Sequence, residues 1–114
     1  MFSKEDLADL IPRVGGEYNV IRSNGHDVHI HSLLTGHDWI IQSNYIDEQC
    51  IILHRHSNMY PYHRQHGHYA SIWDALVYIR QHDESYYKHH MKFKKNQSRH
   101  ESASIHSSVV AQSD

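Results

Sequence analysis

Apolar and polar residues alternate with a period of two in the first half of the chain. The alternation covers residues 18–22 and again residues 28–31, and it is typical of strands with one buried and one solvated face. The two runs are separated by a segment that contains Asn24 and Gly25. Asn-Gly favours a type I′ turn, in which both central residues have positive φ. The pattern therefore predicts a β-hairpin with this turn type.

Two further strands are predicted downstream. Thr35-Gly36 indicates a turn, and the apolar run 39–41 follows it as a third strand. A polar turn at 44–48 separates that run from a fourth strand at 50–54, which includes Cys50 and is apolar on both faces. Because the connections are short, we expect an antiparallel meander of three or four strands.

Helical signals lie on either side of these strands. Ser3 is a suitable N-cap for a short helix over residues 3–10, which Pro12 should end. Ser71 caps a longer helix, which either continues towards His90 or breaks near Asp83. Its apolar residues recur at helical spacing, and we expect them to cover one face of the sheet. The apolar residues concerned are Ile72, Trp73, Leu76, Val77 and Ile79, and they should lie over Val20, Val28, Ile30, Ile41 and Leu53.

The predicted fold class is α+β. It consists of a short N-terminal helix, a three- or four-stranded antiparallel sheet, and a long C-terminal helix packed on one face. With 114 residues the chain has room for one domain, which we place at residues 1–92. Residues 93–114 are rich in polar and basic residues and poor in large apolar ones, so we expect a disordered tail.

Composition restricts the class of protein and the compartment in which we expect it. A single cysteine excludes an intramolecular disulfide framework, and no apolar run approaches the roughly 20 residues of a membrane span. The acidic N-terminus lacks the apolar region of a signal peptide, so we expect a cytoplasmic protein. The 14 histidines are unusual, and they make the net charge depend strongly on pH near neutrality.

The segment 54–69 is the first candidate for function. It holds five histidines, three tyrosines and two arginines but no acidic residue, and it connects sheet to helix. Tyrosine and arginine are typical anchors of protein interfaces. We therefore expect a small non-catalytic module, a regulator or inhibitor, that recognises a macromolecular partner. A protein is the favoured class of partner. The predicted contact residues are Tyr60, Tyr62, His63, Arg64, His66, His68 and Tyr69. An exposed strand edge at 18–22 also allows a homo-oligomer.

Metal binding is an alternative. His29 and His31 form one His-x-His pair on a strand, and His54 and His56 form another. Residues two apart on a strand project from the same face, so each pair can share an ion. Imidazole ligands suit zinc, nickel or copper. Solvated polar side chains on a strand give the same pattern, so no cofactor is the simpler expectation.

Nucleic-acid binding is the other alternative, and catalysis is the least favoured. Residues 86–114 carry five basic residues, which could contact phosphates: Lys88, Lys92, Lys94, Lys95 and Arg99. The first 60 residues carry eight acidic against four basic residues, which disfavours a broad basic face. The chain has no phosphate-binding glycine loop, Gly-x-Ser-x-Gly or His-Glu-x-x-His motif, so we do not expect an enzyme.

Overall fold

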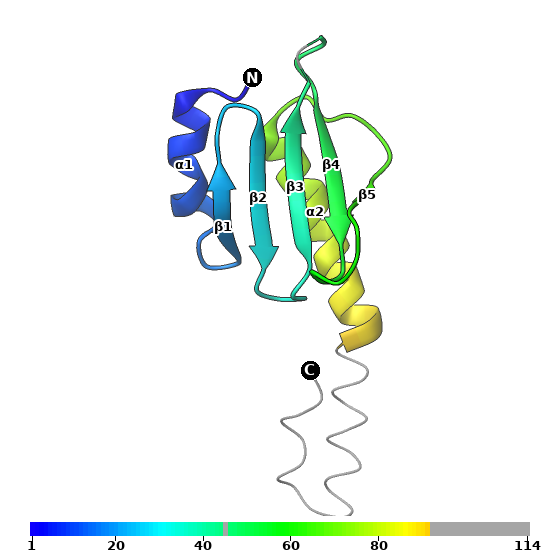
Figure 1. Cartoon of the computed structure of the whole chain (residues 1–114). Helices are drawn as coiled ribbons and strands as arrows, with labels where there is room; N and C mark the ends of the chain where they lie inside the picture. Colours follow the sequence, from blue (N-terminus) through cyan, green and yellow to red (C-terminus); the bar gives the residue numbers. More distant parts are fainter. Residues whose placement is uncertain (45, 92–114) are drawn as a thin grey trace, which may run out of the picture.

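The computed structural model describes residues 1–44 and 46–91 (Figure 1). An N-terminal helix precedes the strands, and a long helix follows them. In chain order the elements are α1 (Lys4–Val14), β1 (Tyr18–Ser23), β2 (Asp27–Ser32), β3 (Asp38–Ser43), β4 (Cys50–Arg55), β5 (His63–Arg64), α2 (Ile72–Tyr86) and the π-helical turn η1 (Tyr87–Met91). The tail predicted at residues 93–114 lies outside the described residues.

The sheet is an antiparallel meander, which confirms the predicted fold class. Its strand order is β1-β2-β3-β4-β5, so each strand pairs with its neighbour in sequence. The sheet has five strands instead of the predicted three or four. The additional strand, β5, consists of two exposed polar residues paired with the end of β4. A strand this short carries no alternation that a sequence pattern could reveal.

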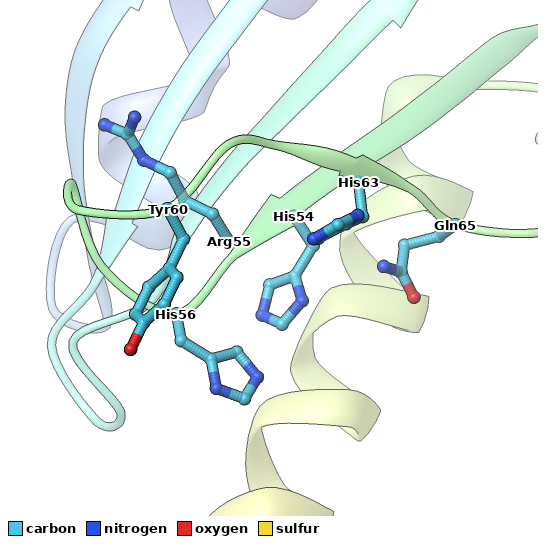
Figure 2. A pocket seen from close by; sticks show the side chains of 6 residues that line it. All are labelled: His54, Arg55, His56, Tyr60, His63 and Gln65. Atoms are coloured by element: carbon cyan, nitrogen blue, oxygen red, sulfur yellow. The ribbon is translucent and has the colours of Figure 1, made fainter.

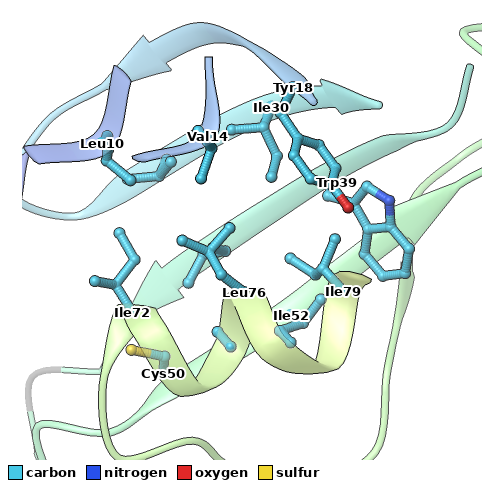
Figure 3. Close-up of a cluster of buried hydrophobic side chains, with 13 residues drawn as sticks. Leu10, Val14, Tyr18, Ile30, Trp39, Cys50, Ile52, Ile72, Leu76 and Ile79 are labelled. Carbon is cyan, nitrogen blue, oxygen red and sulfur yellow. The ribbon is translucent and has the colours of Figure 1, made fainter. Parts of the chain in front are cut away.

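One face of the sheet is covered by α2, and the core lies between them (Figures 1 and 3). Burying an aliphatic side chain contributes about 1.5–3 kcal/mol, so this layer supplies most of the stability. The buried apolar residues are Leu10, Val14, Tyr18, Val28, Ile30, Trp39, Ile41, Cys50, Ile52, Ile72, Ala75, Leu76 and Ile79.

Two expectations about the core are wrong. Leu53 does not face α2; it pairs with Ile40 on the other face of the sheet, and Ile52 takes its place in the core. The run 50–54 is apolar throughout, so alternation could not assign its faces. Val77 is half exposed, because it lies outside the face of α2 that packs on the sheet. That face contains Ile72, Leu76 and Ile79.

Helix α1 is longer than predicted. Its N-cap is confirmed, because the Ser3 hydroxyl accepts a 3.0 Å hydrogen bond from the Asp6 N–H. The helix nevertheless passes through Pro12 to Val14. Pro12 lies on the exposed side of the helix, and Val14 is buried in the core. We infer that burial of Val14 offsets the one backbone hydrogen bond that proline cannot form.

The predicted hairpin is confirmed, but its turn type is wrong. Asn24 and Gly25 both lack positive φ, which within the described ranges is confined to Gly36, Glu48 and Gly67. Instead, the Asn24 side-chain oxygen accepts hydrogen bonds from the backbone N–H groups of His26 and Asp27, each at 2.8 Å. This Asx-type turn connects the strands through three residues and needs no left-handed backbone.

Helix α2 begins where the capping signal predicted. The Ser71 hydroxyl accepts a 3.2 Å hydrogen bond from the Asp74 N–H. The helix does not break near Asp83, which is buried within it, and η1 extends it to Met91. The C-terminal part of α2 lies beside the end of β4, where the ring of His82 is 4.8 Å from that of His54. No helix among residues 1–44 and 46–91 is long and apolar enough to cross a membrane.

Candidate functional site

Three histidines meet where β3 begins and β4 ends. His37 directly precedes β3, His54 lies near the end of β4, and His56 directly follows β4. One nitrogen from each ring lies within 4.8 Å of the other two. In the β3–β4 pairing Trp39 is opposite His54, so the same register places His37 opposite His56. We call His37, His54 and His56 the histidine cluster.

Two rings of the cluster are buried and hydrogen-bonded to each other. The His37 Nδ1 and the His54 Nε2 are 2.9 Å apart and share one proton. Burial, reinforced by the neighbouring histidines, lowers the pKa of His37 to about 4 and the pKa of His54 to about 3. Both imidazoles are therefore neutral at physiological pH. Neutral imidazole is the form that coordinates metal ions.

The spacing of these two nitrogens suits a shared ion. Imidazole nitrogens bind zinc at about 2.0–2.1 Å, which places two ligands of a tetrahedral ion roughly 3.3 Å apart. The observed 2.9 Å separation is a few tenths of an ångström shorter. A metal ion could therefore replace the shared proton with a small separation of the two rings, provided that the donating ring carries its proton on its other nitrogen.

The third ring must rotate to join them. The His56 ring is stacked on that of His37, with centroids 4.2 Å apart and planes inclined by 11°. In parallel stacked rings the nitrogen lone pairs do not converge on one point. His56 is exposed, so its ring can turn towards an ion without disturbing the core.

Aromatic side chains hold the buried part of the cluster. Trp39 stacks on His54 with ring centroids 3.9 Å apart, and its indole N–H donates a 3.2 Å hydrogen bond to Asp83 of α2. Tyr86, also on α2, places its ring edge-on to His37 at 4.4 Å. The long C-terminal helix thus encloses the cluster from the core side.

A fourth histidine lies behind His54. The His82 ring is 4.8 Å from the His54 ring, and burial lowers the pKa of His82. Its Nδ1 is buried and has no hydrogen-bond partner within the part of the chain that the structure describes. His82 therefore adds a further neutral ring to the site, although it is outside the group whose nitrogens lie within 4.8 Å of one another.

A cavity of about 290 Å³ opens beside the cluster (Figure 2). Its lining residues are His54, Arg55, His56, Tyr60, His63 and Gln65. None of these carries a carboxylate. The Arg55 side chain points away from the histidines (Figure 2), because its guanidinium donates to Asp38 at 2.9 Å and lies 4.3 Å from the Tyr62 ring. The histidine cluster is therefore reached from solvent through a space whose lining carries no acidic side chain.

The two predicted His-x-His pairs lie on opposite faces of the sheet. His54 and His56 belong to the cluster, whereas His29 and His31 are half-buried on the face that α2 leaves open. There the His31 Nδ1 lies 2.8 Å from an Asp38 carboxylate oxygen, so it has a partner of its own. His37 was missed, since a single histidine after a turn forms no motif by itself.

The predicted contact residues are exposed to different degrees. Five of them are exposed: Tyr60, His63, Arg64, His66 and His68. Tyr62 is half-buried beneath Arg55, and Tyr69 packs against Tyr78 with ring centroids 5.5 Å apart. Of the basic residues proposed for nucleic acid, Lys88 is exposed on η1. The other four, Lys92, Lys94, Lys95 and Arg99, lie outside the described residues.

Comparison of the chain with protein-family models, with curated proteins and with solved structures gave no match.

Proposed function

We propose that the protein binds one divalent transition-metal ion through His37, His54 and His56. The observation that carries the proposal is the proximity of three imidazole nitrogens, which lie within 4.8 Å of one another, two of them on buried rings. The His37 Nδ1 and the His54 Nε2 are already partnered through their 2.9 Å hydrogen bond. An ion in place of that bond would keep both nitrogens partnered and would also engage the exposed ring.

The ligand set favours copper, nickel and zinc. Imidazole is a borderline ligand that suits these three ions, and a site without carboxylates is poor for magnesium or calcium. By the usual order of stability constants, Cu²⁺ should bind more tightly than Ni²⁺ or Zn²⁺. Which ion the protein carries in a cell also depends on metal availability.

The direct test is calorimetric titration of the chelator-treated, untagged 114-residue chain with Zn²⁺. We expect one site with a 1:1 stoichiometry above any weak binding by the other histidines. His56→Ala should weaken this site at least about 10-fold, because it removes one of three ligands from an exposed position. His66→Ala is the matched control, since it removes an exposed histidine outside the cluster. Absence of a 1:1 site, or an equal loss of Zn²⁺ affinity in both variants, would contradict the proposal.

Tryptophan fluorescence gives an independent readout of where the ion binds. Cu²⁺ at the cluster should quench Trp39 strongly, because the indole ring stacks on His54 at 3.9 Å. A Trp73→Phe background removes emission from the other tryptophan. In that background, quenching should saturate at one equivalent of Cu²⁺ and should be reduced by His56→Ala. Quenching that needs many equivalents would indicate binding elsewhere.

We also propose that the connection between β4 and β5 recognises a protein partner. What supports this second proposal is the high exposure of two adjacent anchors, Met59 at 84% and Tyr60 at 58%. A Tyr60→Ser/Arg64→Ser double variant should lose capture of a specific partner while its melting temperature stays unchanged. Retained capture would contradict this role, and capture that nuclease treatment abolishes would favour nucleic acid.

A further inference from the structure

The pairing of β5 with β4 places another histidine beside the cluster. His63 is directly opposite His54 in this antiparallel ladder. Directly opposite residues project from the same face, with Cβ atoms about 4.5–5.5 Å apart. His63 also lines the cavity that His54 and His56 border (Figure 2). An ion held by the cluster would therefore lie within reach of a fourth imidazole.

The His63 side chain has the freedom to move towards such an ion. It is exposed, and its strand is two residues long. The residue directly after the strand, Gln65, anchors the segment by donating its backbone N–H to the Ile52 carbonyl at 2.8 Å. The cavity of about 290 Å³ leaves room for the ring to turn. Rotation of His63, together with that of His56, would close the coordination sphere.

We propose that His63 is the fourth ligand of the metal ion bound by the histidine cluster, so that the ion ties β5 to β4. This inference rests on the proposed function. Four imidazoles complete the tetrahedral arrangement that zinc adopts in closed, structural sites. The ion would then bridge β3, β4 and β5, where β5 is otherwise held by a short ladder.

Metal binding would thereby control the connection at residues 56–62. This segment begins with His56 and is followed directly by His63, and both histidines would coordinate the same ion. Fixing both ends restricts the conformations of the exposed anchors Met59 and Tyr60. The metal would act as a regulator of the surface that we propose for partner binding.

Cobalt substitution distinguishes four protein ligands from three. Co²⁺ gives strong visible absorption bands in a tetrahedral site. We expect these bands in the wild type and in His66→Ala, and altered, weaker bands in His63→Ala. The affinity for Zn²⁺ should fall at least about 10–100-fold in His63→Ala. Mutation of a residue that only contacts a ligand already costs that much, and His63 would be a ligand itself. His63→Gln, which keeps a polar side chain, should behave like the alanine variant.

Hydrogen exchange tests the proposed control of the connection. Zn²⁺ should slow amide exchange at residues 57–60 and at Tyr62 in the wild type and in His66→Ala, but not in His63→Ala. If the wild type binds no Zn²⁺, the proposed function itself fails. If the wild type and both His63 variants bind Zn²⁺ equally, with the same cobalt spectrum and the same exchange, the centre stands with three ligands and the role of His63 is overturned.

Discussion

The Tyr18 hydroxyl donates a 2.7 Å hydrogen bond to the Asp83 carboxylate, and this bond joins the first strand to the last helix. The same buried carboxylate accepts from the Trp39 indole at 3.2 Å and from the Thr35 hydroxyl at 3.4 Å. Asp83 therefore fixes α2 against β1, β3 and the turn that connects β2 to β3. Because Trp39 stacks on His54, this network also holds one wall of the histidine cluster.

Replacing Asp83 should strongly destabilise the fold. Asp83→Ala would leave buried donors on Tyr18 and Trp39 without an acceptor, at a cost of about 1–3 kcal/mol for each unsatisfied group. We expect the free energy of unfolding to fall by roughly 2–5 kcal/mol in urea denaturation. Glu84→Ala is the control, because Glu84 is the next residue and is exposed. A loss no larger than that of the control would show that the network is energetically minor.

The Asp83 carboxyl should also make stability depend on pH. Burial raises the pKa of Asp83 in the folded protein above its usual value near 3.9, even though its hydrogen-bond donors act in the opposite direction. The folded state therefore keeps this proton to higher pH than the unfolded chain does. The resulting stabilisation is complete below the unfolded pKa and is lost as pH rises through the folded pKa.

A comparison with Asp83→Asn isolates this pH effect. The amide has nearly the same volume and retains an oxygen acceptor, while every other titrating group is common to both proteins. The unfolding free energy of the wild type relative to the variant should decrease as pH rises above about 4 and then level off. Urea denaturation of both proteins between pH 4 and 8 measures this difference in unfolding free energy. A difference that increases with pH would mean that burial does not raise this pKa.

Metal binding should raise the melting temperature through mass action. A ligand that binds only the folded state stabilises it by about 2.7 kcal/mol at a free concentration 100-fold above its dissociation constant. Zn²⁺ should therefore stabilise the chelator-treated wild type in thermal denaturation. We expect little effect on a His37→Gln/His56→Gln double variant. Equal stabilisation of this variant and the wild type would place the ion outside the cluster.

Local signals in the sequence predicted the types of elements better than the end of helix α1 or the type of turn at Asn24. The capping serines Ser3 and Ser71 correctly marked the starts of both helices, because a cap acts within three residues. Pro12 did not end α1, since burial of Val14 is a tertiary contact that the local pattern omits. Asn24 marked a turn but not its type, because its side chain bonds the backbone two and three residues ahead.

The sequence by itself determined the α+β order of elements and the fact that His54 and His56 share a face, because side-chain direction alternates along a strand. It also indicated that His29 and His31 face away from Val28 and Ile30. Only the tertiary structure decided which face of β4 lies under α2, since its residues are apolar on both sides.

His37 joined the cluster through the β3–β4 register, which brings it to His54, 17 positions away in the sequence. Pairing register is set by turn geometry and by the hydrophobic pattern of the strands. Because β4 is apolar on both faces, its pattern did not decide the register. The chemistry of the site was therefore visible in the composition, whereas its geometry came from the fold.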